Sequence, residues 1–214
     1  MAAPSDNSKR KNSENLSLPS GEGVIVDIGT GDGRFVYRLA QQNPNRFYIG
    51  IDANAAALKE ISTKAARKPA RGGLANVLFL QAAVENLPEE LNGAADEIHI
   101  HFPWGSLLRA VATGDKGVLE NLRRICAPHC LLEIVIGIDQ ERDKSEIERL
   151  GLPQLTTEYL KKVLTPKYNS AGFEAIESDV LSSADWSRLE TSWARKLQGN
   201  ESRKVVYFIA QANL

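Results

Sequence analysis

Three glycines and two aspartates near the start of the chain have the types and spacing of a ligand-binding turn. Gly29, Gly31 and Gly33 stand at alternate positions, Asp27 lies two residues before the first of them, and Asp52 ends the next apolar run. Glycine allows backbone angles that are closed to other residues and lets a ligand approach the backbone closely. Where such a turn joins a strand to a helix, it is typical of a site that binds a nucleotide-like molecule.

The two aspartates indicate which nucleotide-like molecule fits this turn. Asp52 can accept hydrogen bonds from both ribose hydroxyls, and Asp27 can hold an ammonium group, directly or through water. The free N–H groups at the start of the following helix suit a carboxylate as well as a phosphate. A nicotinamide dinucleotide needs similar glycines and a similar acidic residue, but Asp27 would repel its pyrophosphate. We therefore predict S-adenosylmethionine as the cofactor, bound by Asp27, Gly29, Gly31 and Asp52.

A tryptophan later in the chain is placed to meet a second ligand. Trp104 lies between Pro103 and a glycine, directly after a strand expected over residues 97–102. A core tryptophan rarely sits between two chain-turning residues, so we expect an exposed ring on which a base can stack for about 1–3 kcal/mol. His99 and His101 share one face of this strand, and we interpret them as a partly buried pair rather than as catalytic groups.

A run of basic residues follows Asp52. A helix is expected over residues 54–67, and Lys64, Arg67 and Lys68 have the spacing of one helix face. A solvated face is the usual meaning of such a run, but Glu60 is the only acidic residue that interrupts it between residues 59 and 71. We therefore predict a positive patch that binds phosphates.

A second tryptophan near the C-terminus also stands beside basic residues. Trp193 is followed by Lys196, and Arg203 comes after a short polar loop. An aromatic ring next to cations is a common signature of nucleic-acid binding, so this segment is a second candidate for contact with a base and its phosphates.

Apolar runs alternate with helical patterns along most of the chain, which indicates an α/β fold with a doubly wound sheet. Two late runs joined by a loop suggest an antiparallel pair at the end of the sheet. This ending favours a class I methyltransferase over a dehydrogenase. We therefore expect a Rossmann-like, mostly parallel sheet of seven strands with an antiparallel last strand. The expected strands cover residues 24–28, 47–51, 77–81, 97–102, 131–138, a segment that begins near Gly172, and 205–209.

Composition limits the class of protein further. The chain has 214 residues, with 26 basic and 27 acidic side chains, so binding to nucleic acid must rely on local patches. We expect a flexible, polar tail over residues 1–20 and one domain over residues 21–214. Cys126 and Cys130 flank a histidine, but no second pair completes a zinc site, so we expect two reduced thiols and no metal. No signal or membrane-spanning run is present, which favours the cytoplasm.

Taken together, these motifs resemble the kanamycin–apramycin resistance group, a family of aminoglycoside-resistance methyltransferases that modify N1 of adenine 1408 in 16S rRNA. The resemblance runs from about Val24 to the C-terminus. Its most specific elements are DIGTGDGR at 27–34, FYIGID at 47–52, KP at 68–69, GGL at 72–74, NV at 76–77, FPWG at 102–105, GLP at 151–153 and SWA at 192–194.

The resemblance implies roles for individual residues. Further cofactor contacts would come from Ala83, Val84, Glu85 and Thr191. For Glu85, a solvated charge at the start of a loop is an equally good explanation. The flipped adenine would lie between Trp104 and Trp193, with backbone carbonyls near Phe102 and Pro103 beside the developing charge. The rRNA phosphates would be held by Lys64, Arg67, Lys68, Lys196 and Arg203.

The expected activity is therefore transfer of a methyl group to N1 of that adenine in the assembled small ribosomal subunit, by a monomeric enzyme that confers aminoglycoside resistance. Two alternatives use the same fold. One is a methyltransferase that acts on N7 of a tRNA guanine or on a small molecule. The other is a non-catalytic RNA-binding protein that keeps the cofactor pocket as a scaffold.

Overall fold

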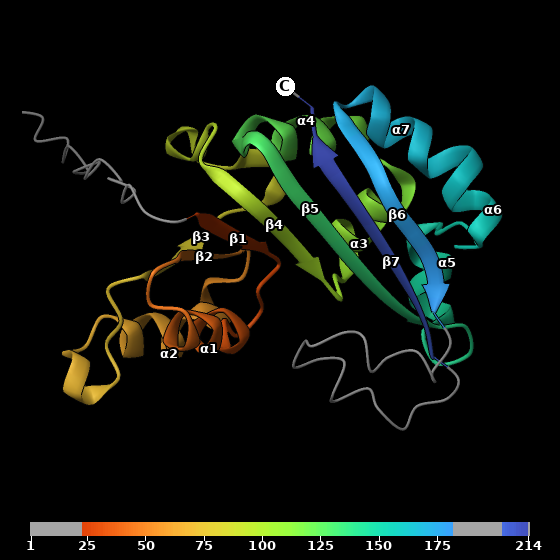
Figure 1. Ribbon diagram of the computed structural model, residues 1–214. Helices are drawn as coiled ribbons and strands as arrows, with labels where there is room; N and C mark the ends of the chain where they lie inside the picture. The colour runs from red at the N-terminus through yellow and green to blue at the C-terminus, as the bar shows by residue number, and fades with distance from the viewer. Residues whose placement is uncertain (1–22, 182–202, 214) are drawn as a thin grey trace, which may run out of the picture.

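The computed structural model describes residues 23–181 and 203–213, which form one seven-stranded sheet with helices on both faces (Figure 1). The strand order is β3-β2-β1-β4-β5-β7-β6. Only β7 runs antiparallel to its neighbours, β5 and β6, which confirms the predicted mostly parallel sheet with an antiparallel last strand. The strands are β1 (Val24–Ile28), β2 (Phe47–Asp52), β3 (Val77–Gln81), β4 (Ala95–His101), β5 (Cys126–Asp139), β6 (Phe173–Leu181) and β7 (Arg203–Ala212).

The helices form two layers, each with its own apolar core. One layer packs Val36 and Ile61 against Ile25 of β1. The other packs Leu108 and Leu122 against the opposite face of the central strands. Figure 1 shows the first layer, α1 (Arg34–Gln42) and α2 (Ala55–Ala65), apart from the remaining helices. Those helices are α3 (Gly105–Thr113), α4 (Lys116–Ile125), α5 (Lys144–Leu150), α6 (Thr157–Tyr159) and α7 (Thr165–Ser170), with a π-helical turn at Leu160–Leu164 between the last two.

The connections explain why a site forms at the carboxyl ends of the central strands. From β1 the chain winds outward through β2 to β3, and from β4 it winds the other way to β5. β1 and β4 therefore lie side by side at the point where the winding reverses, with Asp27 of β1 opposite His99 of β4. In open α/β sheets, ligands bind at the carboxyl ends of the strands at such a point.

Several element boundaries differ from those expected, and three of them have a clear local reason. Helix α2 ends at Ala65 rather than at residue 67, because Lys68 precedes a proline and takes an extended backbone conformation. Strand β4 ends at His101, because Phe102 has a positive φ of 51°. Strand β5 begins at Cys126, five residues early, because that residue already pairs with Ala95.

Candidate active site

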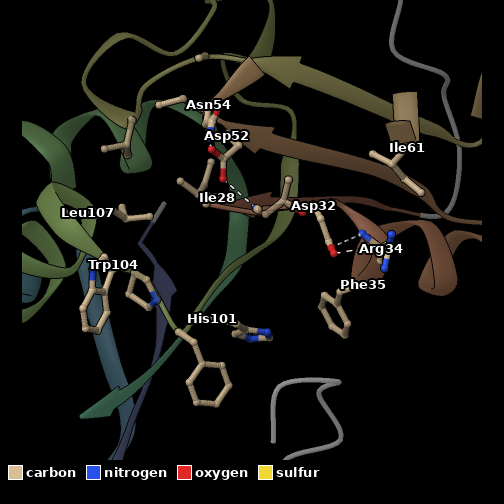
Figure 2. Close-up of a pocket in the computed structure, with 18 of the residues that line it drawn as sticks. Ile28, Asp32, Arg34, Phe35, Asp52, Asn54, Ile61, His101, Trp104 and Leu107 are labelled. Atoms are coloured by element: carbon tan, nitrogen blue, oxygen red, sulfur yellow. Dashed lines mark hydrogen bonds and ion pairs between the residues drawn. The ribbon is translucent and has the colours of Figure 1, made fainter. Parts of the chain in front are cut away.

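A cavity of about 1290 Å³ opens at the carboxyl ends of β1, β2 and β4. The glycine turn forms one wall, the loop after β3 forms another, and the segment after β4 forms a third (Figure 2). The predicted site residues that line it are Gly29, Gly31, Asp52, Lys64, Ala83, Val84, Glu85, Phe102, Pro103 and Trp104. The fold thus brings segments far apart in the sequence to a single cavity.

The glycine turn has the conformation that its sequence predicts. Gly29, Gly31 and Gly33 have φ values of 76°, 60° and 66°, in the region that favours glycine. A Cβ atom at Gly31 would meet no atom within 4 Å, whereas one at Gly33 would lie 2.5 Å from the ring of Phe79. Gly31 therefore leaves space beside the cavity for a ligand, and Gly33 lets α1 pack closely on the sheet.

The N–H groups of the turn itself are bonded within the protein. Those of Gly29 and Thr30 donate to the carbonyl of Ile51, at 2.8 and 3.0 Å. The N–H of Gly31 donates to Oδ2 of Asp52 at 2.8 Å, and that of Arg34 donates to Oδ1 of Asp32 at 3.1 Å. These bonds hold the turn in shape. The donors expected for a ligand carboxylate lie at the start of α1, where the N–H of Arg34 is the one engaged by Asp32.

Asp52 lies at the end of β2 and faces the cavity (Figure 2). Its Oδ1 atom accepts a hydrogen bond from the N–H of Asn54 at 2.8 Å, and its Oδ2 atom accepts the one from Gly31. Each carboxylate oxygen can accept a second bond, because it carries two lone pairs. The carboxylate is thus fixed from both sides and can still receive two hydroxyl groups.

Asp27 is buried beneath the turn, only 5% exposed, and is not among the described residues that line the cavity. Burial raises the pKa of its carboxyl group, and the charge of His101 opposes that rise. The expected direct contact with an ammonium group is therefore less well supported than a contact through water.

The histidine pair forms as the sequence predicts. The rings of His99 and His101 stack with centroids 5.0 Å apart and an interplanar angle of 11°. Nε2 of His101 bonds Oε1 of Glu133 at 2.6 Å, and Nε2 of His99 lies 3.5 Å from Oε2 of Glu97. His101 also lines the cavity, which the sequence reasoning did not anticipate.

The segment after β3 forms the side of the cavity beyond Asp52. Ala83 and Glu85 are exposed there, whereas Val84 is buried. The carbonyl of Glu85 accepts a hydrogen bond from the side chain of Asn121 at 2.9 Å, which ties this segment to α4. The Glu85 side chain remains open to a ligand or to solvent. It can therefore contact the cofactor or be a solvated charge at the start of a loop, as the sequence allowed.

The segment after β4 presents an exposed aromatic ring. Trp104 lies at the edge of the cavity (Figure 2) and is 54% exposed. Pro103 is buried, and Phe102 is half-buried. The N–H of Phe102 donates to the carbonyl of Val135 at 2.7 Å, which anchors the turn that carries the tryptophan. The expected exposure of this ring is confirmed.

The basic residues after α2 divide between two hollows. Lys64 lines the main cavity, with its Nζ atom 4.3 Å above the ring centre of Tyr37. Arg67, Lys68 and Arg71 line a separate hollow of about 520 Å³. Because α2 ends before Arg67, the predicted helix face is wrong, but the turn that follows still gathers three cations.

Helix α1 contributes a polar edge that the sequence reasoning missed. Arg34, Tyr37, Arg38 and Gln41 all line the main cavity. Arg34 pairs with Asp32 and Glu60 at 3.6 and 3.4 Å, both exposed contacts. The signal was present in the sequence, because residues 34, 38 and 41 share one face of a helix.

Several predicted residues lie outside the described residues. These are Thr191, Trp193 and Lys196. Arg203 is described in its backbone alone, as the first residue of β7, where it pairs with Asp139. Within residues 23–181 and 203–213, no cluster of histidine, cysteine and acidic side chains could hold a metal ion, and Cys126 and Cys130 are free and buried. In the same residues, no helix is both long and apolar enough to cross a membrane.

The fold is that of an S-adenosylmethionine-dependent methyltransferase. It is defined by the sheet order, by the antiparallel β7 and by a cavity between a glycine turn and an aspartate at the end of β2. The family model for NpmA, 16S rRNA (adenine(1408)-N(1))-methyltransferase, matches residues 10–212. The chain belongs to this family, which confirms the resemblance seen in the sequence.

Known relatives are similar to this chain over most of its length. It is 37% identical to an Escherichia coli 16S rRNA (adenine(1408)-N(1))-methyltransferase, covering 84% of this chain and 83% of that protein. The structure of the aminoglycoside resistance methyltransferase NpmB1 is similar, with a TM-score of 0.77 and 44% identity over 89% of this chain and 88% of that one. A mutant of the 16S rRNA (adenine(1408)-N(1))-methyltransferase from Catenulisporales acidiphilia, solved with its cosubstrate SAM, gives a TM-score of 0.81 and 35% identity over 91% of this chain and 88% of that one.

Proposed function

We propose that this chain transfers a methyl group from S-adenosylmethionine to N1 of adenine 1408 of 16S rRNA and so confers resistance to aminoglycosides. The observation that carries the proposal is the exposed Trp104 at the rim of a cavity that the glycine turn also lines. A cofactor site and a base-stacking surface thus face the same space, as a methyl transfer to a base requires. Membership of the NpmA family supports the choice of base.

The residues of the cavity fit S-adenosylmethionine. Asp52 can receive the ribose hydroxyls, and the open space beside Gly31 fits a ligand that lies against the turn. Ala83, Val84 and Glu85 stand beyond Asp52, where they can border the adenine. Asp27 lies beneath the turn, where its carboxyl group can hold the ammonium group through water, and Thr191 adds a hydroxyl by resemblance. When bound, the cofactor supplies an electrophilic methyl group on a positively charged sulfur.

The chemistry asks little acid–base work of the protein. N1 of neutral adenine already carries a lone pair, so no base is needed to activate it, and alignment is the main demand. A base must leave its stack to expose N1, which costs a few kcal/mol. Stacking on Trp104, and on Trp193 by resemblance, offsets this cost by about 1–3 kcal/mol per ring. Carbonyl groups near Phe102 and Pro103 can stabilise the positive charge that develops on the base.

Phosphate contacts would come from the cations around the cavity. Lys64 lies at its edge, and Arg67 and Lys68 lie in the neighbouring hollow. Lys196 and Arg203 join them by resemblance. We further propose that the monomeric enzyme acts in the cytoplasm on the assembled small subunit, where folded rRNA can contact several of these cations at once.

The test is methylation of three purified substrates with radiolabelled S-adenosylmethionine. Assembled small subunits, free 16S rRNA and bulk tRNA are compared at equal concentration. We expect incorporation into the small subunit to exceed that into the other two. Incorporation into tRNA with none into the subunit would overturn the proposal, and labelling of free rRNA alone would overturn its assembled-subunit part.

A further inference from the structure

The side chain of Tyr37 joins α1 to the basic segment that follows α2. We call this segment, residues 66–73, the basic turn. Tyr37 lies in the first turn of α1 and is buried, and its hydroxyl donates to the carbonyl of Gly72 at 2.6 Å. Both helices pack on the same face of the sheet (Figure 1). This one hydrogen bond therefore ties two segments 35 residues apart to each other.

The basic turn folds back on itself. The N–H groups of Arg71 and Gly73 both donate to the carbonyl of Lys68, at 2.8 and 3.1 Å. A Cβ atom at Gly73 would lie 1.5 Å from the carbonyl oxygen of Arg67, so only glycine fits there. The backbone of the turn is thus compact, and the side chains of its three basic residues are exposed.

Gly72 brings the basic turn close to both Tyr37 and Lys64. Its φ is 85°, in the region that favours glycine. A Cβ atom on Gly72 would lie 3.1 Å from the Tyr37 hydroxyl and 3.2 Å from Cε of Lys64. The Nζ atom of Lys64 lies above the Tyr37 ring, in a cation–π contact. Tyr37 therefore contacts the basic turn through its hydroxyl and Lys64 through its ring.

The basic turn gathers positive charge that no acid balances. Arg67, Lys68 and Arg71 line the same hollow, and none of them pairs with a carboxylate among residues 23–181 and 203–213. Glu60, the one acid in this part of the sequence, pairs with Arg34 instead. Like charges repel, so the three cations stay together only where other contacts hold the backbone that carries them.

Tyr37 provides such a contact without reducing the charge. Within the described part of the chain, its bond to Gly72 is the only side-chain hydrogen bond made to residues 66–73. An acidic side chain in its place would neutralise one cation, whereas the phenol is uncharged. The cations are thus arranged before a ligand arrives. Such an arrangement favours a folded RNA, whose phosphates also have fixed positions, because little order has to be gained on binding.

We propose that Tyr37 is a positioning residue for the rRNA, which holds the basic turn against α1 so that its cations meet phosphates of the folded RNA in a fixed arrangement. This inference rests on the proposed function. Tyr37 acts through the cations and takes no part in methyl transfer. Its loss should therefore weaken the binding of the small subunit and leave the rate of the bound complex unchanged.

The test is the steady-state methylation of small subunits at saturating S-adenosylmethionine. The variant Tyr37→Phe removes the hydroxyl but keeps the ring beneath Lys64 and the net charge of the protein. We expect KM for small subunits to rise about threefold to tenfold, as the loss of one hydrogen bond gives when that bond sets the competent fraction of the turn. The value of kcat should stay within about twofold of the wild-type value. An unchanged KM would overturn the inference.

The chain provides a matched control in the other helix layer. The hydroxyl of Tyr168 donates to the carbonyl of Val111 at 3.0 Å, and this side chain is also buried. Tyr168→Phe therefore removes the same kind of bond on the opposite face of the sheet. It should lower the free energy of unfolding and leave KM at the wild-type value. An equal rise of KM in the two variants would trace the effect to lost stability and would overturn the inference.

Two further variants test whether Tyr37 acts through the basic turn. Gly72→Ala disturbs the same contact from the turn and should raise KM as Tyr37→Phe does; a wild-type KM in this variant would contradict the inference. In the background Arg67→Ala with Lys68→Ala, Tyr37→Phe should add less than about twofold, because two of the residues that it positions are gone. The full rise in that background would also overturn the inference. Wild-type protein that methylates no small subunits would instead overturn the proposed function itself.

Discussion

Two glycines of the same turn should respond to alanine differently, Gly33 mainly in stability and Gly31 mainly in cofactor binding. Both have positive φ values, so alanine at either position costs about 1–2 kcal/mol of backbone strain. At Gly33 the new Cβ would also lie 2.5 Å from Phe79 and 2.8 Å from Ile61, and such overpacking adds about 1–3 kcal/mol. At Gly31 the Cβ meets no atom within 4 Å, so strain is the whole cost to folding.

The expected results follow from this difference. Urea unfolding should show a loss of about 2–5 kcal/mol in the free energy of unfolding for Gly33→Ala and of about 1–2 kcal/mol for Gly31→Ala. Calorimetry should show that Gly31→Ala, though folded, binds S-adenosylmethionine at least about tenfold more weakly, because its Cβ fills space that the ligand needs. Wild-type affinity in Gly31→Ala, or equal destabilisation in the two variants, would refute the account of the turn.

Three further predictions concern the base, the phosphates and acid stability. Trp104→Ala should lower kcat/KM on small subunits by about 5–150-fold, the equivalent of 1–3 kcal/mol of stacking, while Trp104→Phe retains most of it. In the double variant Arg67→Ala with Lys68→Ala, the slope of log affinity for RNA against log salt concentration should become shallower by about two, as filter binding would measure. An unchanged slope would exclude phosphate contacts at these two residues. His99 first, and then Arg46, lower the pKa of Glu97 from 4.5 to about 2, so the stabilisation from these contacts is present above pH 4.5 and is lost as the pH falls toward 2. Unfolding curves of Glu97→Gln should therefore depend less on pH over that range.

The sequence predicted the fold well, because strong local signals mark its elements. Alternation of apolar runs and helices gave the strand list, and the late pair of runs gave the antiparallel β7. The glycine turn was predictable because each glycine must take a positive φ. The exposure of Trp104 was predictable because a proline and a glycine flank it.

The parts that could not be predicted depend on contacts between distant segments. His101 and Glu133 are 32 residues apart, and alternation along one strand identifies a shared face but not the partner on the next strand. The N–H groups of the turn are satisfied by Ile51 and Asp52, which reach them only once β2 pairs with β1. The end of helix α2 is a different case, because its signal was local and available: Pro69 restricts Lys68, and this restriction outweighed the helical spacing of the cations.

The most direct test of the proposed activity is primer extension across 16S rRNA from small subunits treated with the protein and S-adenosylmethionine. A methyl group on N1 blocks the edge of adenine that pairs with an incoming nucleotide, so reverse transcriptase cannot pass it. We expect a strong stop at adenine 1408 that requires both protein and cofactor and that is weakened in Trp104→Ala. Full-length extension through that position in treated subunits, with the protein shown to bind S-adenosylmethionine, would contradict it.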